Sequence, residues 1–241
     1  MVEISIHFED KRYSIKAELL SQQLNLPINT DTPIFLQVTD KLSLIKKGCK
    51  PLSCDFHWQT WAKYRTQAKP MLINACKPKP GKSMIDATAG WGKDAALLAT
   101  FGARVIMLER HPVMVALLED GLARQTDVDR VHLNMSLVKA NAIEYLDNLL
   151  LAHYPDVIYC DPMHPEREKS ALVKNNMQLL QAVIGCEEDA SLLLDVAQKR
   201  VRDKVVMKWP VSQLPLQKPM HSYTGKTVRY DVYPSHDRKG V

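Results

Sequence analysis

The stretch MIDATAGWGKDA, Met84–Ala95, places two glycines directly after a short apolar run and before a segment with a helical pattern. Gly90 and Gly92 permit backbone angles that are closed to other residues, and they leave room for a ligand to approach the main chain. The first amide groups of a helix that begins near Lys93 are free to face such a ligand. The stretch therefore predicts a small-molecule site at the carboxyl end of the first strand of a parallel sheet.

Strand-like and helix-like segments alternate after this turn. Short apolar runs predict strands, and longer segments with helical periodicity predict helices. We expect strands at 84–89, 103–109, 131–140, 156–160 and 204–209, two strands across the turn within 221–233, and helices at 93–101, 112–125, 142–150, 170–184 and 188–200. This order predicts an α/β domain with a mostly parallel sheet, and the closing hairpin predicts an antiparallel edge.

The first 75 residues predict a small α+β region of their own. Strands are expected at 3–8, 34–38 and 41–46, with a helix at 17–24 and another at 57–69. The tract KPKPGK at 77–82 breaks regular structure, so we divide the chain into a region at 1–75 and a domain at 76–241. Trp58 and Trp61 form either a buried helix face or, with Tyr64, rings that stack on unpaired RNA bases.

Composition and charge place the chain among globular proteins. It has 241 residues, of which 46% are apolar and 24% charged, and no apolar run approaches the length of a membrane span. The N-terminus has acidic residues early and lacks the apolar core of a secretory signal. Five scattered cysteines without a CxxC pair indicate reduced thiols in a cytoplasmic protein and no metal site. The net charge of +5 is compatible with a phosphate-binding surface or with simple solvation.

Acidic residues around the turn distinguish between two possible ligands. Glu109 ends the second predicted strand about twenty residues after the glycines, where an acid accepts hydrogen bonds from both hydroxyls of a ribose. The third glycine of the dinucleotide motif is replaced by Ala95, and Asp94 lies where a pyrophosphate needs neutral amides. Asp86 suits the positively charged methionine end of S-adenosylmethionine. The pattern favours S-adenosylmethionine over NAD, and a turn that binds no ligand is the simplest structural interpretation.

A second motif, DVIYCDPMHP at 156–165, follows an apolar strand with an acid and two prolines. Asp161 is expected at the ligand edge of the sheet, and Pro162 stiffens the extended loop that follows. A carboxylate and a backbone carbonyl there can accept both N–H bonds of an exocyclic amine and direct its lone pair at a methyl group. The motif resembles the one that methyltransferases acting on exocyclic amines carry at this strand end, an acid or amide followed by prolines and an aromatic. This resemblance implies that Asp161 and Pro162 are catalytic and that His164 stacks on the base. The structural alternative is a simple turn at the end of a strand.

The order of motifs resembles one family. DATAGWGKDA, MLERHP, VALLEDGLAR, DPMHPEREKSALVKNNM, KVVMKWP and KTVRYDVY follow one another as in the RsmJ-type 16S ribosomal RNA guanine-N2 methyltransferases, over 83–233. The resemblance implies a class I S-adenosylmethionine-dependent methyltransferase fold, Rossmann-like, with seven strands. It also implies methylation of the exocyclic N2 amine of one guanosine near the 3′ end of bacterial 16S rRNA, with S-adenosylhomocysteine as product.

The resemblance also assigns residues. Its donor-binding positions fall on Lys93, Asp94, Glu109, Arg110, Asn141, Ala142 and Asp161, and they join Asp86, Gly90 and Gly92 from the turn. Lys93 replaces the arginine common in the family, the Asn141–Ala142 pair replaces two hydroxyl residues, and His164 replaces a phenylalanine. The segment at 54–70 lacks the glycines that the family has before the fold.

RNA is the expected partner, either as 16S rRNA or within the small ribosomal subunit. Lys169 is a predicted phosphate contact, since cations near the active edge can face the RNA backbone. Lys208 ends a predicted strand, so we expect it near the active-site edge, where it can contact the substrate. Three alternatives remain open. The acceptor could be another exocyclic amine, on adenine in nucleic acid or in a protein amide. The protein could instead be an NAD-dependent oxidoreductase, or an RNA-binding module without catalysis.

Overall fold

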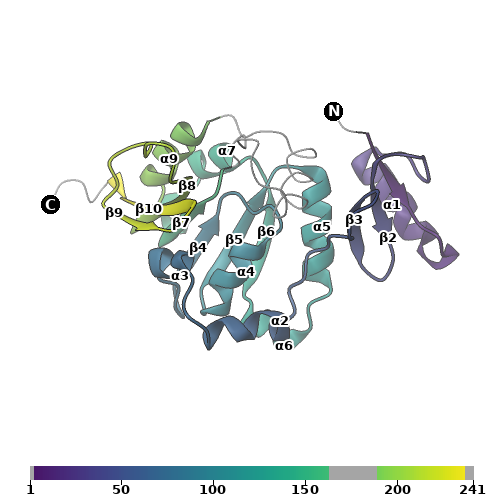
Figure 1. Cartoon of the computed structure of the whole chain (residues 1–241), viewed down its shortest axis with the longest axis horizontal. Helices are drawn as coiled ribbons and strands as arrows, with labels where there is room; N and C mark the ends of the chain where they lie inside the picture. Colours follow the sequence, from purple (N-terminus) through teal and green to yellow (C-terminus); the bar gives the residue numbers. More distant parts are fainter. Residues whose placement is uncertain (1–2, 163–188, 237–241) are drawn as a thin grey trace.

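The computed structural model of the chain describes residues 3–162 and 189–236, and Figure 1 shows a larger and a smaller sheet. The larger sheet has seven strands in the order β6-β5-β4-β7-β8-β10-β9. They are β4 (Ser83–Asp86), β5 (Arg104–Glu109), β6 (Met135–Lys139), β7 (Val157–Cys160), β8 (Lys204–Pro210), β9 (His221–Thr224) and β10 (Val228–Pro234). Strands β4 to β8 pair in parallel and β10 runs antiparallel to both neighbours, so the predicted sheet is confirmed.

Helices cover both faces of this sheet. Alternate residues of a strand point to opposite faces, and two apolar clusters separate accordingly. Met84 packs in the cluster that contains α4 (Lys93–Thr100) and α5 (Pro112–Ala123), whereas Ile85 packs in the cluster that contains α7 (Ala142–Asp147) and α9 (Ala190–Lys199). Pro112 occupies the first turn of α5, as predicted. The helix predicted at 170–184 lies outside the described residues.

Two local predictions were wrong in part, and one helix was missed. The strand expected at 131–140 begins only at Met135, because Asp127–His132 forms α6, whose capping box joins Thr126 and Asp129. The helix expected at 57–69 is the short α2 (Trp58–Ala62) followed by a 3-10 turn at Lys63–Arg65. Helix α3 (Met71–Cys76) was not predicted.

The smaller sheet contains β1 (Ile4–His7), β2 (Ile34–Val38) and β3 (Leu42–Lys46), with α1 (Ser14–Leu24) after β1, as predicted. Asp120 on α5 connects it to the larger sheet, since its carboxylate accepts hydrogen bonds from the Leu42 amide and the Lys16 ammonium, both at 3.0 Å. None of the four cysteines in the described residues forms a disulfide.

The segment between the two sheets packs on the larger one. Phe56 is buried against Gly92 and Gly121, and α3 contacts α4, β9 and β10. The predicted division at residues 75 and 76 stays a prediction, and this packing argues for a boundary closer to residue 53.

Asp129 anchors the segment to α6. Its carboxylate accepts hydrogen bonds from the Trp58 amide at 2.6 Å, the Thr126 amide and hydroxyl, both at 2.8 Å, and His57 Nδ1 at 3.1 Å. Burial alone would raise the pKa of Asp129, but these hydrogen bonds outweigh it and lower the pKa below its ordinary value. The group therefore joins two elements that are about seventy residues apart in sequence.

We expect Asp129→Ala to reduce the free energy of unfolding by about 3 kcal/mol, because it leaves several buried donors without an acceptor. Denaturant unfolding at neutral pH measures this loss, and Asp127→Ala, on the same helix but exposed, is the matched control. A carboxyl whose pKa is lowered by folding stabilises the protein above its unfolded pKa, near 4, and less as the pH falls. The difference between wild type and the Asp129 variant should therefore shrink below about pH 4. Equal stability of the two proteins at pH 7 would contradict the anchoring role.

Candidate active site

The ends of β4 and β7 bring the two predicted motifs together. The strands pair in parallel with Asp86 opposite Tyr159, and the Ala87 amide donates to the Tyr159 carbonyl at 2.8 Å. One residue beyond β7, the Asp161 amide donates to Thr88 Oγ1 at 2.6 Å. The glycine turn and the Asp161–Pro162 loop therefore share one edge of the sheet, as the sequence predicts.

The two glycines of the turn have different roles. Both have positive φ, 50° at Gly90 and 68° at Gly92. A side chain at Gly92 would place its Cβ 2.7 Å from Phe56 Cζ and 2.9 Å from Leu118 Cδ2, so this glycine allows α4 to pack on buried side chains. The Gly90 amide instead donates to Glu109 Oε2 at 3.1 Å and ties the turn to the end of β5. Packing therefore explains why a glycine is needed at position 92. Close approach of a ligand to the backbone can explain only the glycine at position 90.

Two buried acids lie behind the turn. Asp86 Oδ1 accepts from the Thr88 amide at 3.1 Å, whereas Oδ2 is buried with no hydrogen-bond partner in the described residues. Burial and the nearby Asp94 carboxylate raise the pKa of Asp86 well above its ordinary value. Glu109 Oε1 accepts from the His111 amide at 2.8 Å, and burial raises the pKa of Glu109 despite its hydrogen bonds. A buried carboxylate oxygen without a partner is costly unless a ligand supplies a donor or a cation.

Four side chains form a charged cluster beside this turn. Lys208 Nζ donates to Asp161 Oδ2 at 2.6 Å and lies 3.9 Å from Asp94 Oδ2. The hydroxyl of the buried Tyr159 donates to the same Asp94 oxygen at 2.6 Å. The Lys208 ammonium group thus lies between the Asp161 carboxylate at the end of β7 and the Asp94 carboxylate at the start of α4. These contacts fix the three groups relative to one another.

The cluster changes the acidity of its members. Burial raises the pKa of Asp161 to about 6, with the Lys208 ammonium opposing this shift and the Asp94 carboxylate adding to it. Burial would lower the pKa of Lys208, but the charges of Asp161 and Asp94 outweigh it and raise that pKa. The pKa of Asp161 is therefore shifted above its ordinary value, and a shifted pKa of this kind is typical of functional sites.

The other predicted residues occupy several environments. Asn141 caps α7, where its Oδ1 accepts from the amides of Ile143 at 2.9 Å and Glu144 at 3.3 Å. The Ala140 amide donates to the Glu109 carbonyl at 3.0 Å, so the Asn141–Ala142 pair begins next to the end of β5. Lys93 and Arg110 are exposed, and Pro162 is buried. The predictions for His164 and Lys169 lie outside the described residues.

Sequence reasoning missed three contributors to this edge: Thr88, Tyr159 and Tyr230. Tyr159 was included in an apolar strand, and strand alternation would have placed it on the same face as Asp161. Tyr230 is opposite Lys208 in the β8–β10 register, and burial raises its pKa to about 12. Neither pairing across strands nor the Thr88 contact has a local sequence signal.

The residues at this edge fit S-adenosylmethionine. Asp86 offers an unpartnered carboxylate oxygen suited to an ammonium group, and the buried Trp91 Nε1 also lacks a partner in the described residues. Glu109 lies one strand away, at the position suited to a ribose. Within residues 3–162 and 189–236, no three His, Cys, Asp or Glu side chains are grouped as a metal site requires. In the same ranges, no helix has the length and apolar character needed to cross a bilayer.

Comparisons with known proteins show the family of this chain. A family model described as "Putative SAM-dependent methyltransferase" matches residues 19–235. A Legionella pneumophila (strain Lens) protein named Ribosomal RNA small subunit methyltransferase J is 49% identical over 232 residues, which cover 95% of each chain. A protein of the same name from Coxiella burnetii is 39% identical over 237 residues, covering 90% of this chain and 91% of that one.

A solved structure has the same architecture. The crystal structure of a SAM-dependent methyltransferase from Neisseria gonorrhoeae aligns with a TM-score of 0.74 and 27% identity, over 98% of this chain and 99% of that one. The predicted class I fold and methyl donor are confirmed, and the oxidoreductase alternative is set aside. The chain belongs to the ribosomal RNA small subunit methyltransferase J family of S-adenosylmethionine-dependent methyltransferases.

Proposed function

We propose that this protein transfers a methyl group from S-adenosylmethionine to the exocyclic N2 amine of one guanosine near the 3′ end of 16S rRNA. The observation that carries the proposal is the position of Asp161, whose carboxylate accepts a hydrogen bond from Lys208 and whose amide is bonded to Thr88 of the glycine turn. The names of the relatives support RNA of the small ribosomal subunit as substrate. The motif resemblance supports guanine N2 as the acceptor, and ribosomes as substrate support a cytoplasmic location.

The donor site in this proposal is formed by three strand ends. Asp86 binds the methionine ammonium, the turn around Gly90 passes close to the donor, and Glu109 binds the ribose hydroxyls. The Asn141–Ala142 pair faces the adenine, and Asn141 can use only its Nδ2 for this because its Oδ1 caps α7. The family resemblance also assigns three further residues to the border of the donor site: Lys93, Asp94 and Arg110.

The chemistry needs an amine that can attack. The lone pair of a guanine N2 amine is delocalised into the ring, so the free amine is a poor nucleophile. S-adenosylmethionine supplies an activated methyl group on a sulfonium. Asp161 accepts one N–H bond of the amine and the Pro162 carbonyl accepts the other, which localises the lone pair and aims it in line. The Asp161 carboxylate, with a pKa of about 6, can then hold the proton that the methylated amine loses.

In this proposal Lys208 acts on Asp161 at the active-site edge. Its ammonium group bonds Asp161 and lies near Asp94, so it acts within the reaction centre and keeps the Asp161 carboxylate ionised. In the described residues, Asp161 Oδ1 has no hydrogen bond, which leaves it open to the amine. Lys208 is therefore a positioning residue.

Methyl transfer from labelled S-adenosylmethionine to small-subunit particles, and separately to their free RNA, tests the proposal. The substrates come from cells that lack this protein, and nucleoside analysis identifies the product. N2-methylguanosine at one site near the 3′ end is the expected result. Labelled N6-methyladenosine or labelled protein would replace the acceptor with one of the alternatives, and RNA binding without transfer would favour the non-catalytic module.

We expect Glu109→Ala to weaken S-adenosylmethionine binding by about 1–3 kcal/mol, because two hydrogen bonds to the ribose are lost. The variant also frees the Gly90 and His111 amides, so the thermal midpoint without ligand must be compared as well. Calorimetric titration with S-adenosylhomocysteine measures the affinity. An unchanged dissociation constant would mean that the end of β5 does not hold the ribose.

A further inference from the structure

The positive charge of this protein is concentrated in one segment. Residues 56–85 contain six Lys and Arg residues and no Asp or Glu, whereas residues 1–55 contain seven of each sign. Since the whole chain has a net charge of +5, the segment accounts for all of it. A net charge concentrated in this way indicates a surface for a polyanion and not general solvation.

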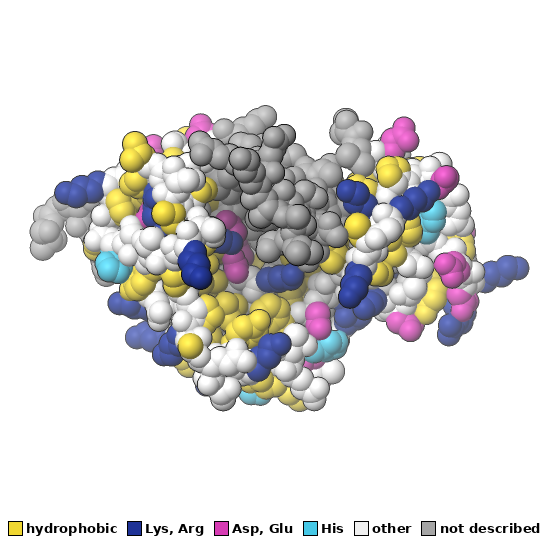
Figure 2. All heavy atoms as spheres, viewed as in Figure 1, with side chains coloured by type: hydrophobic (Ala, Val, Ile, Leu, Met, Phe, Trp, Pro, Cys, Tyr) yellow, Lys and Arg dark blue, Asp and Glu magenta, His cyan; other side chains and the backbone are white. Residues whose placement is uncertain are grey.

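The cations of the segment are largely uncompensated. Lys82 pairs with Asp203 at 3.4 Å. The other five have no carboxylate within ion-pair distance in residues 3–162 and 189–236; they are Lys63, Arg65, Lys69, Lys77 and Lys79. By contrast, Lys47 and Lys16 near the smaller sheet pair with Asp31 and Asp120. In Figure 2, dark blue side chains without magenta lie on the lower left of the molecule, around the position of α3 in Figure 1.

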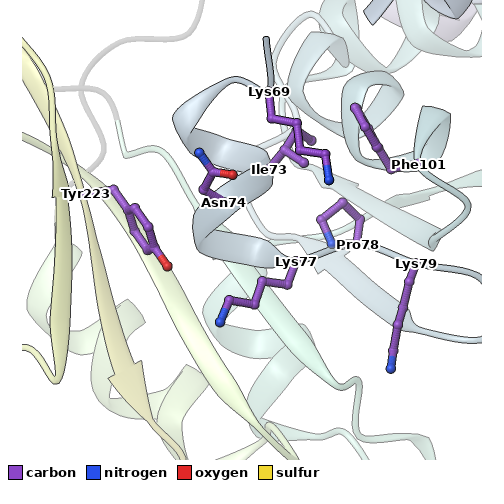
Figure 3. A pocket seen from close by; sticks show the side chains of 8 residues that line it. All are labelled: Lys69, Ile73, Asn74, Lys77, Pro78, Lys79, Phe101 and Tyr223. Atoms are coloured by element: carbon purple, nitrogen blue, oxygen red, sulfur yellow. The ribbon is translucent and has the colours of Figure 1, made fainter. Parts of the chain in front are cut away.

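Three of these lysines line an open pocket of 390 Å³ at α3, with β9 on one side of the helix and the end of α4 on the other. Lys69, Lys77 and Lys79 line it together with Asn74, Phe101 and Tyr223. Figure 3 shows Tyr223 on β9 with its hydroxyl toward α3, and Lys69, Pro78 and Phe101 on the other side of the helix. The volume falls within the range of about 300–1,000 Å³ of small-molecule sites. Cations beside aromatic rings are the combination that binds single-stranded RNA, with phosphates on the cations and bases on the rings.

One wall of the pocket, formed by Tyr223, is close to the reaction centre. Tyr223 is opposite Tyr230, which in turn is opposite Lys208, the partner of Asp161. Residues paired across strands share a face, and adjacent strands are about 4.8 Å apart, so Tyr223 lies about 10 Å from Lys208 along the sheet. An RNA strand with its target base at Asp161 can therefore extend to the pocket.

We propose that the pocket at α3 binds a nucleotide of the same rRNA strand that carries the target guanosine. The ammonium groups of Lys69, Lys77 and Lys79 bind its phosphates, and the ring of Tyr223 contacts its base. This inference rests on the proposed function, because it assumes that the strand at Asp161 is RNA. It adds an RNA contact away from the reaction centre, which positions the substrate and performs no chemistry.

The test compares two variants that remove the same charge. One carries Lys69→Gln, Lys77→Gln and Lys79→Gln, and the control carries Lys11→Gln, Lys46→Gln and Lys50→Gln, which are exposed on the N-terminal region. Binding of a 3′-terminal 16S rRNA fragment to the full chain is measured from low to high salt. The pocket variant should bind at least about tenfold more weakly, and the slope of log affinity against log salt should fall by about 2, since each phosphate contact contributes about 0.7.

Further readouts separate the pocket from the proposed function. Affinity for S-adenosylhomocysteine and kcat at saturating RNA should stay at wild-type values in the pocket variant, while KM for RNA rises. Tyr223→Ala should weaken RNA binding by about tenfold, and Tyr223→Phe should restore it, because stacking needs only the ring.

Several results would overturn the inference. Equal losses in the pocket and control variants would mean that overall charge alone attracts RNA. An effect on assembled subunits but not on free RNA would assign the surface to a ribosomal protein. If wild type methylates rRNA and the pocket variant does so with the same KM, only the pocket inference fails. If wild type methylates no rRNA, the proposed function fails and the inference fails with it.

Discussion

Asp161→Ala should reduce kcat for methyl transfer by at least about a thousandfold, while donor affinity stays within about tenfold of wild type. The carboxylate is the group that localises the amine lone pair, so its loss removes an interaction made mainly in the transition state. Donor affinity should survive because Asp86 and Glu109, on neighbouring strands, carry the contacts to the donor. Their positions are held by Thr88, Gly90 and His111 and not by Asp161.

The measurement is single-turnover methyl transfer to small-subunit RNA, with calorimetric binding of S-adenosylhomocysteine in parallel. Asp161→Asn is the matched control, because it keeps the shape and one acceptor while losing the charge that pairs with Lys208. An intermediate rate for the Asn variant would separate hydrogen-bond acceptance from charge. A wild-type rate in the Ala variant would show that the amine is activated elsewhere.

The sequence predicted the architecture well because each element carries a local signal. The strands at 103–109, 156–160 and 204–209 are short apolar runs, and Pro112 marks the start of a helix; all four lie where predicted. The acids at the strand ends also carry a local signal, because a carboxylate at the end of an apolar run stands out in the sequence. Asp86, Glu109 and Asp161 all lie at one edge of the sheet.

Most of the features that the sequence did not predict depend on contacts between distant segments of the chain. Gly92 is required by Phe56, which is thirty-six residues earlier in the chain, and no property of the turn itself indicates that neighbour. Helix α6 is an exception, because the capping box of Thr126 and Asp129 is a local signal that the strand prediction at 131–140 overlooked; only the bonds of Asp129 to Trp58 and His57 depend on a distant segment. Lys208 was expected near the active-site edge because it ends a strand, but only the sheet register reveals that it reaches Asp161.

Lys208→Met should shift the pH dependence of methyl transfer to higher pH. In wild type, kcat/KM should rise through the pKa of Asp161, about 6, because the carboxylate must be ionised to accept the N–H bonds of the amine. The Lys208 ammonium opposes the upward shift that burial imposes on this pKa. Removing it should raise the acid limb by about 2 pH units, since an adjacent opposite charge shifts a pKa by about 1–3 units.

The expected loss of kcat/KM in the Met variant therefore depends on pH. At pH 7 the Met variant should retain about a tenth of wild-type kcat/KM, because only about a tenth of Asp161 would be ionised with a pKa near 8. The rate should recover toward pH 9, whereas Asp161→Ala should not recover at any pH. Lys208→Arg keeps the charge and should keep the acid limb near pH 6, even if its rate is lower. A Met variant with an unshifted limb would show that Lys208 only supports the fold of β8, and would leave the ionisation of Asp161 to other neighbours.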